Sequence, residues 1–279
     1  MTTQQITLET MTFAHLRDAL ELSRHVEWPH RREDWELMQS LSQGVVVQEE
    51  GRVVGTILMT PYGDDAATVN MVIVDAAMRG RGLGRKLMEE ALAKAGGRTC
   101  YLVATQEGLA LYEKLGFVAT GKIVQHQGLA PSVDAPAHVS WGKDGDHARL
   151  VALDRAAFGH DRSALMRSLR ERAKFAVVRD EGNVQAFAAV RRFGRGLVIG
   201  PVVGRKLHEA RCLIDFLLAD SAGEFVRIDT DESTALGEWL TRRGLAHVGG
   251  GITMRRTADE PKVEIRSHQT YALVSQALG

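Results

Sequence analysis

The stretch from Val72 to Met88 reads Val-Ile-Val-Asp-Ala-Ala-Met-Arg-Gly-Arg-Gly-Leu-Gly-Arg-Lys-Leu-Met, and it decides how the chain is interpreted. A β-branched run ends at Asp75, glycines then stand at positions 80, 82 and 84, and a helical pattern follows at once. In a strand that leads through a glycine loop into a helix, the backbone N–H groups of the loop point outward. The dipole of the helix favours an anion at that place. The same helix start carries four cations, Arg79, Arg81, Arg85 and Lys86. Since cations oppose the dipole at that end, their clustering predicts a bound polyanion.

Two common phosphate-binding motifs do not fit this loop. A Walker loop would need a glycine, a lysine and a hydroxyl residue beginning at position 85, where the chain has Arg85 and no hydroxyl nearby. The dinucleotide fingerprint fails because its third glycine, Gly84, comes one residue early. The order Arg-Gly-Arg-Gly-Leu-Gly over 79–84 does resemble the acetyl-CoA pyrophosphate loop of the GCN5-related N-acetyltransferase (GNAT) superfamily. The alternative is a plain glycine turn with solvated arginines.

A second motif downstream supports this resemblance. Gly96-Gly97 ends the predicted helix, a buried strand is expected over 99–104, and a short helix over 107–115 stops at Gly116. The string Leu-Tyr-Glu-Lys-Leu-Gly-Phe over 111–117 resembles the last GNAT motif, whose tyrosine protonates the departing CoA thiolate. That tyrosine corresponds to Tyr112. A phenol of pKa about 10 suits a thiolate of pKa about 8.5. Outside the motif, Tyr112 would be interpreted as a core residue with a satisfied hydroxyl.

The resemblance implies acetyl-CoA as cosubstrate, and it implies which residues contact it. The strand would pair with the pantetheine arm and the loop would hold the pyrophosphate. The implied cofactor-binding residues are Val72, Ile73, Val74, Arg79, Gly80, Arg81, Gly82, Leu83, Gly84, Arg85 and Thr105. Thr105 stands where many family members carry an asparagine, and its hydroxyl reaches less far than an amide.

Signals for the acceptor side are weaker. The family reaction is direct attack of a primary amine on the acetyl thioester in a ternary complex, and it needs a proton acceptor. Asn70 stands where some members carry an acid and cannot serve, and Asp75 is expected to cap the loop. The base is left open. The substrate-side candidates between the first two predicted helices are Glu27, Trp28, His30, Asp34 and Trp35, of which Trp28, His30 and Asp34 are retained; surface or core roles are the alternatives.

The order of elements predicts a tandem fold. A helix over 14–24 is followed by the segment 28–35, which leads into a second helix that ends at about Leu41. A hairpin turning at Glu50-Gly51, a strand over 68–74, the loop, and a helix-strand-helix-strand series then follow GNAT order. After a proline-containing segment the order restarts, with a hairpin at Glu181-Gly182 and helices over 146–169, 209–219 and 236–243. Gly-Arg-Lys-Leu at 84–87 recurs at 204–207, but the second copy has no Arg-x-x-Gly and carries Leu240 where the first has Tyr112.

We therefore predict an α/β (α+β) protein with two GNAT-like domains, each a mixed, mostly antiparallel sheet flanked by helices. Residues 1–127 would form the catalytic domain, 128–140 a linker, and 141–279 a degenerate accessory domain. The strings at 153–163, 199–203 and 272–279 resemble the accessory half of the YitH-like two-domain acetyltransferases. A non-catalytic module that binds acetyl-CoA or a protein is the alternative function, and Tyr112 disfavours it.

Composition limits the remaining possibilities. The chain has 279 residues, and at about 150 residues per domain that length suggests two domains. Lys+Arg and Asp+Glu balance at 35 each, which gives no sign of a nucleic-acid or membrane partner. The N-terminus lacks signal-peptide features, so a cytoplasmic protein is expected. Cys100 and Cys212 suit reduced core thiols, and the histidines show no ligand spacing, so no metal is expected. The acceptor would be a small-molecule or peptide amine, and the sequence leaves the oligomeric state open.

Overall fold

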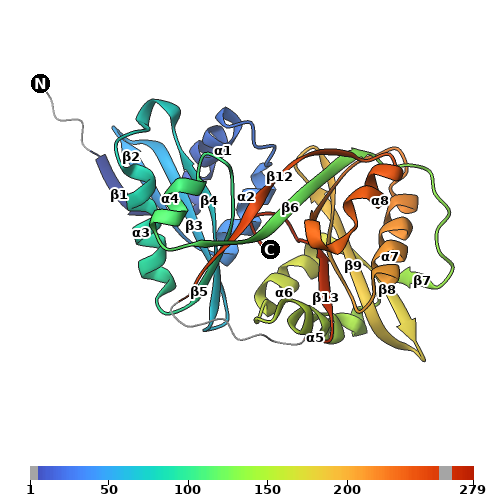
Figure 1. Ribbon diagram of the computed structural model, residues 1–279. Coiled ribbons are helices and arrows are strands. Elements are labelled where there is room, and N and C mark those ends of the chain that lie inside the picture. The colour runs from blue at the N-terminus through green and yellow to red at the C-terminus, as the bar shows by residue number, and fades with distance from the viewer. Residues whose placement is uncertain (1–5, 258–265) are drawn as a thin grey trace, which may run out of the picture.

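The computed structural model describes residues 6–257 and 266–279, and Figure 1 shows its two halves side by side. The strands are β1 Ile6–Thr10, β2 Gln43–Glu49, β3 Arg52–Tyr62, β4 Ala66–Val74, β5 Thr99–Ala104, β6 Val118–Leu129, β7 Val139–Trp141, β8 Ala173–Asp180, β9 Asn183–Phe193, β10 Gly196–Gly204, β11 Phe225–Asp231, β12 Ala246–Arg256 and β13 Gln269–Ala272. The α-helices are α1 Leu16–His25, α2 Arg32–Leu41, α3 Leu83–Ala95, α4 Leu109–Lys114, α5 His147–Phe158, α6 Ser163–Arg172, α7 Leu207–Asp220 and α8 Gly237–Arg242.

All these strands belong to one sheet, in the order β1-β2-β3-β4-β5-β12-β6-β11-β13-β10-β9-β8-β7. Only β4–β5 and β10–β11 pair in parallel, so the sheet is mixed and mostly antiparallel, as predicted. The two predicted hairpins are the β2–β3 and β8–β9 turns. The predicted linker 128–140 is shorter than expected, because β6 continues through Leu129 and β7 begins at Val139.

The sequence did not indicate that the two halves exchange strands. The strand after α4 is β6, and it pairs with β11 of the second half. The strand after α8 is β12, and it pairs with β5 of the first half, with Ile252 opposite Ala104. The two exchanged strands also pair with each other, and both cross the middle of the molecule in Figure 1. A chain cut near Gln127 would therefore leave β5 without its neighbour β12.

Helices cover both faces of this sheet. On one face, α1, α2, α5 and α6 bury side chains in a single hydrophobic cluster that includes strands of both halves. On the other face, α3 and α4 cover the first half, while α7 and α8 cover the second. A core that crosses the boundary and an exchanged strand pair fix the two halves against each other. Among the described residues, no helix has both the length and the apolar character needed to cross a membrane.

Candidate active site

The parallel strands β4 and β5 separate near the middle of the first half. They pair only over Ala66–Thr68 and Thr99–Tyr101, and the register of β4 against β3 shifts beside Thr56. Met71 has a left-handed backbone there, with φ 50°, and the Thr56 hydroxyl donates to its carbonyl oxygen at 2.8 Å. A bulge of this kind bends a strand. The edge of β4 over Val72–Val74 consequently faces a groove where a β5 partner would otherwise lie.

The glycine loop between β4 and α3 presents free backbone donors to this groove. Gly80 and Gly82 have φ of 77° and 75°, and a Cβ added to either would meet no atom within 4 Å. In the part of the chain that the structure describes, the N–H groups of Gly80, Gly82 and Gly84 donate to no protein acceptor. Gly82 is the N-cap of α3, so these donors lie at the positive end of the helix dipole. The loop thus fits a phosphate group.

The groove has a volume of about 910 Å³ and contains nearly the whole predicted cofactor set. Its lining includes Val72, Ile73, Val74, Arg79, Gly80, Gly82, Leu83, Gly84, Arg85 and Thr105. Arg81 is the exception, because its Nη1 lies 3.0 Å from both Glu49 Oε1 and the sulfur of Met78. Asp75 caps the loop as expected, accepting from the Ala77 N–H at 2.9 Å, and this bond lowers its pKa.

Tyr112 lies on α4 at the inner end of the groove. Its side chain is 8% exposed, and burial raises its pKa to about 12, so the phenol is protonated at neutral pH. The ring packs against Gly108, where an added Cβ would lie 2.7 Å from ring atom Cε2. Phe117 contacts the ring edge-on, with centroids 6.2 Å apart. A glycine at position 108 is therefore what lets this phenol occupy its place.

A second cavity of about 380 Å³ meets the groove at Tyr112. Glu27, Trp28, Val72, Thr105 and Tyr112 line both hollows. The second half supplies Phe193, Arg195, Arg227, Val248, Gly250, Ser275, Gln276 and Ala277 to the wall of the second cavity. One molecule can thus reach the junction along β4 while another reaches it from between the two halves.

Trp28 and His30 line this second cavity, whereas Trp35 does not. The His30 ring packs edge-on against Trp28 and Phe193, at centroid distances of 5.8 and 5.5 Å. Burial lowers the pKa of His30 to about 4, so its imidazole is neutral at neutral pH. Trp35 is fully buried in the shared core and donates to Ser23 Oγ at 3.3 Å. Of the two tryptophans, only Trp28 can contact an acceptor in this cavity.

Asp34 joins the two halves and does not line either hollow. Its Oδ2 accepts from the N–H groups of Arg31 and Gly194, each at 2.9 Å, and the Arg31 guanidinium binds both carboxylate oxygens. Gly194 belongs to the β9–β10 turn of the second half. These bonds hold that turn, with Phe193 and Arg195, against the loop between α1 and α2. Asp34 therefore positions cavity residues that come from the other half.

Glu27 has a strained backbone at the junction of the two hollows. It follows α1 with φ 59°, its N–H donates to Arg24 at 3.0 Å, and the Trp28 N–H donates to Ser23 at 2.9 Å. This is the Schellman arrangement, in which glycine is favoured at the left-handed position. An L-residue costs about 1 kcal/mol there. Strain of this kind, kept beside a cavity, points to a functional side chain.

The second half repeats the motif around Tyr112 without its phenol. Leu240 takes the fourth position of α8, as Tyr112 does in α4, and it is fully buried. The glycines that follow, Gly116 and Gly244, have φ of 85° and 87°. This match supports a duplicated element whose second copy lacks a proton donor.

Within the described residues of the second half, 141–257 and 266–279, the anion loop has no counterpart. Only Arg205 and Lys206 separate β10 from α7, and both of their N–H groups donate to Glu209 Oε2, at 2.7 and 3.1 Å. A carboxylate of the protein thus occupies the donors that a phosphate would need. The repeated Gly-Arg-Lys-Leu strings are not equivalent in space, because Gly84 lies inside α3 while Gly204 ends β10.

The sequence did not indicate the second-half residues of the acceptor cavity, nor Gly108. Arg195 and Val248 belong to no motif. Gln276 lies in the 272–279 string, which gives no sign of a cavity, and the three residues are far apart in the chain. They meet because β12 is exchanged and because the β9–β10 turn binds Asp34. The only local signal was Gly194-Arg195-Gly196, a turn sequence that gives no information on what it faces.

Comparison with known protein families gives one match in each half. Two models, each described as an acetyltransferase (GNAT) domain, match residues 40–119 and 150–272, one in each half. The chain belongs to the GCN5-related N-acetyltransferase superfamily and carries two of its domains in tandem.

Individual relatives match this chain over nearly its whole length. The chain is 28% identical to the uncharacterized N-acetyltransferase YitH of Bacillus subtilis over 284 aligned residues. The alignment covers 95% of each protein. It is also similar to a Pyrococcus horikoshii structure described only provisionally as an acetyltransferase, with a TM-score of 0.81 and 21% identity. The match covers 100% of this chain and 98% of that one. A tandem GNAT protein from the clavulanic acid biosynthesis pathway gives a TM-score of 0.63 at 17% identity, over 92% of this chain and 100% of that one. At these identities the two structures show the fold alone.

Proposed function

We propose that this protein transfers an acetyl group from acetyl-CoA to a primary amine by direct attack in a ternary complex. The observation that carries the proposal is the junction of two hollows at Tyr112, one reached along β4 and the other from between the halves. The glycine loop and Arg79 would hold the pyrophosphate, and Val72–Val74 would hold the pantetheine arm. The acetyl thioester would then lie beside Tyr112.

We assign the two proton transfers to Glu27 and Tyr112. The ammonium form of the acceptor gives a proton to Glu27, and its nitrogen then attacks the carbonyl carbon. When the C–S bond breaks, the thiolate takes the Tyr112 proton and leaves as the CoA thiol. The nitrogen then loses its surplus proton, which restores the Tyr112 phenol through water, and Glu27 releases its proton to solvent. Glu27 fits the first role better than His30. It lines both hollows, whereas burial lowers the pKa of His30 to about 4 and so makes its imidazole a weak proton acceptor. Asn70 Oδ1 is buried in the acceptor cavity without a partner among the described residues, so it can accept the amine's remaining N–H.

In this proposal, residues 1–127 supply the cofactor site and the chemistry, and residues 141–279 shape the acceptor side. The described part of the second half has no free anion loop, and Leu240 stands where the first half has the Tyr112 phenol, yet it contributes the Phe193 wall and a cation, Arg195. Pockets at domain interfaces commonly set substrate choice. Because β12 crosses into the first half, this division can be tested only in the full chain.

The direct test combines thiol release with product analysis. Acetyl-CoA would be offered with small amines, polyamines, amino acids, amino sugars and lysine peptides, while free CoA is measured and products are weighed by mass spectrometry. We expect amine-dependent CoA release and a matching acetylated product. Tight acetyl-CoA binding without turnover on any amine class would instead support the non-catalytic binding module.

The acceptor is expected to carry an anionic group. Arg195 lines the cavity and, within residues 6–257 and 266–279, forms no ion pair, whereas Arg227 binds Asp229 through two bonds of 2.8 and 3.0 Å. Arg195→Gln should raise the KM of an amine bearing a carboxylate or phosphate by roughly tenfold, the value of one charge-assisted hydrogen bond. Its kcat should stay unchanged, and neutral amines should be unaffected. An equal effect on charged and neutral amines would contradict this assignment.

Glu27→Gly should stabilise the fold while it impairs turnover. Glycine relieves the left-handed strain, so the free energy of unfolding should rise by up to about 1 kcal/mol. Loss of the proton acceptor should lower kcat on the order of 10²-fold. Chemical denaturation and steady-state kinetics measure the two effects.

Glu181 offers a matched control for this variant. It also has a left-handed backbone, with φ 46°, in the β8–β9 turn and away from both hollows. Glu181→Gly should give a similar gain in stability and leave kcat unchanged. Glu27→Gln, which keeps the strain and removes the charge, should lose activity without gaining stability. If Glu27→Gly keeps full activity, Glu27 is only a helix end.

A further inference from the structure

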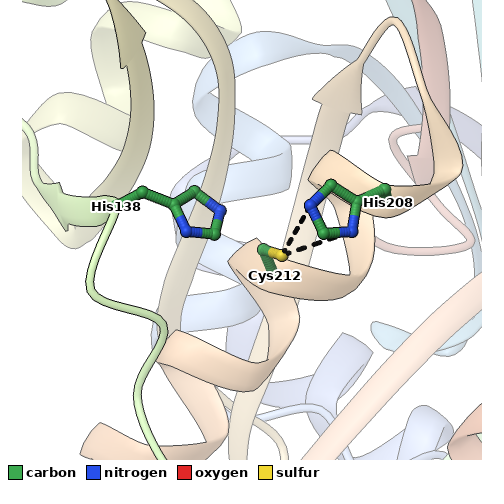
Figure 2. Close-up of side chains that lie close together, drawn as sticks. All are labelled: His138, His208 and Cys212. Carbon is green, nitrogen blue, oxygen red and sulfur yellow. Dashed lines mark hydrogen bonds between the residues drawn. The ribbon is translucent and has the colours of Figure 1, made fainter.

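Three side chains with metal-binding atoms lie close together in the second half, as Figure 2 shows. His208 and Cys212 are one turn apart on α7, and His138 comes directly before β7. One ligand atom from each residue lies within 4.8 Å of the others. No second group of this kind occurs in the described parts of the chain. None of the three residues lines the groove or the acceptor cavity, so the acetyl transfer proposed above does not use them.

The pair on α7 already has the spacing that a tetrahedral metal requires. Residues four apart lie on the same face of a helix. Cys212 Sγ is 3.6 Å from His208 Nε2 and 3.8 Å from Nδ1, so the two nitrogens lie at nearly the same distance from the sulfur. Zinc bonds to sulfur and nitrogen of about 2.3 and 2.0 Å, at a tetrahedral angle, separate the two atoms by about 3.6 Å. The measured separation matches that value.

The third ligand comes from a backbone that is fixed against α7. Val139, next to His138, pairs with Val178 of β8, and its N–H donates to Pro136 at 3.1 Å. Val139 and Cys212 are buried in the same hydrophobic cluster. The His138 and His208 rings lie nearly parallel, with centroids 6.0 Å apart. Both rings are exposed. Rotation of these two side chains would bring their nitrogens from within 4.8 Å of the other ligand atoms to bonding distance of a shared ion.

We propose that His138, His208 and Cys212 bind one divalent cation of the zinc class, with water in the fourth position. Two imidazoles and a thiolate suit a borderline-soft ion and exclude Mg²⁺ and Ca²⁺, which prefer oxygen ligands. On coordination, the Cys212 thiol loses its proton to solvent and the sulfur bonds to the metal. The ion would fasten the segment 130–138 to α7. The sequence did not predict this site, because His138 is far from the His-x-x-x-Cys pair in the chain.

Cobalt(II) is the probe for this site, because its four-coordinate thiolate complexes absorb visibly and zinc does not. The full chain would be stripped with a chelator and titrated with Co²⁺. We expect one Co²⁺ per chain, a thiolate-to-cobalt charge-transfer band, and loss of that band when Zn²⁺ is added. Thermal melting should also shift upward with saturating Zn²⁺. Absence of the band, or an unchanged melting temperature, would overturn the proposal.

Single substitutions assign the signal. Cys212→Ser should remove the charge-transfer band, and His208→Asn, at an exposed position, should weaken Co²⁺ affinity by more than about tenfold, since even outer-shell changes cost that much. Cys100→Ala is the matched cysteine control. His247→Asn is the matched histidine control, because it removes one ring of another close pair, His126 and His247. Both controls should bind Co²⁺ as the parent does. A band that survives Cys212→Ser, or that disappears in either control, would refute the assigned ligands.

Discussion

Gly82→Asp is expected to abolish acetyl-CoA binding by the full chain. Gly82 is the N-cap of α3, and its surroundings are open within 4 Å, which is the space a phosphate would enter. A carboxylate placed there meets the pyrophosphate as a like charge. At 4 Å near a protein surface, such a pair costs about 4 kcal/mol, or roughly a thousandfold in Kd. Isothermal titration calorimetry measures the loss.

Gly96→Asp separates this effect from damage to the fold. Gly96 ends the same helix, has a left-handed φ of 62°, and is also open within 4 Å. Both variants carry the same new charge. The backbone strain is at least as large in the control, because Gly96 has ψ −131° whereas Gly82, with ψ 7°, lies in the left-handed helical region. At the C-terminal end an aspartate also opposes the helix dipole, so this control is destabilised at least as much. It should bind acetyl-CoA normally. Near-parent affinity in Gly82→Asp would show that the pyrophosphate lies elsewhere.

The first half was the more predictable part, because its signals are local. The order of strand, glycines and helix over 72–88 needs only neighbouring residues to form, and the structure places β4, the loop and α3 there. The turn at Glu50-Gly51 and the buried strand over 99–104 are set in the same way. A motif that ends in a left-handed glycine, such as Gly116, can likewise be recognised from sequence.

The acceptor side depends on contacts between distant segments, and no sequence pattern encodes those. Each of the strands β6 and β12 follows a short helix and a glycine with positive φ. No local sequence feature therefore shows that β6 pairs with the second half and β12 with the first. Asp34 was predicted to face the substrate because the sequence pattern placed it between the first two helices, whereas the structure places it in the first turn of α2. It contacts Gly194 instead, since that turn supplies the N–H group that a buried carboxylate needs. The role of Gly108 was not predicted, because the need for a glycine there comes only from the Tyr112 ring that packs against it in the structure.

Tyr112→Phe is expected to lower kcat on the order of 10²-fold while acetyl-CoA affinity stays near the parent value. The ring against Gly108 and Phe117 is kept, and the phenol has no protein hydrogen-bond partner in the described residues. Removing it therefore leaves no partner unsatisfied, and the variant should be as stable as the parent. The loss falls on the transition state alone.

The raised pKa of Tyr112 fixes the form of the pH profile. With its pKa near 12, the phenol stays protonated across the assay range, so it should add no descending limb to kcat below about pH 11. Burial in the same groove raises the pKa of the CoA thiol as it raises the pKa of the Tyr112 phenol. The pKa values of the proton donor and the leaving group thus rise together. Tyr112→Leu reproduces the residue that the second half carries at Leu240 and should also be inactive. If Tyr112→Phe turned over at the parent rate with thiolate departure rate-limiting, the phenol would be structural, and the proton would have to come from solvent in the groove.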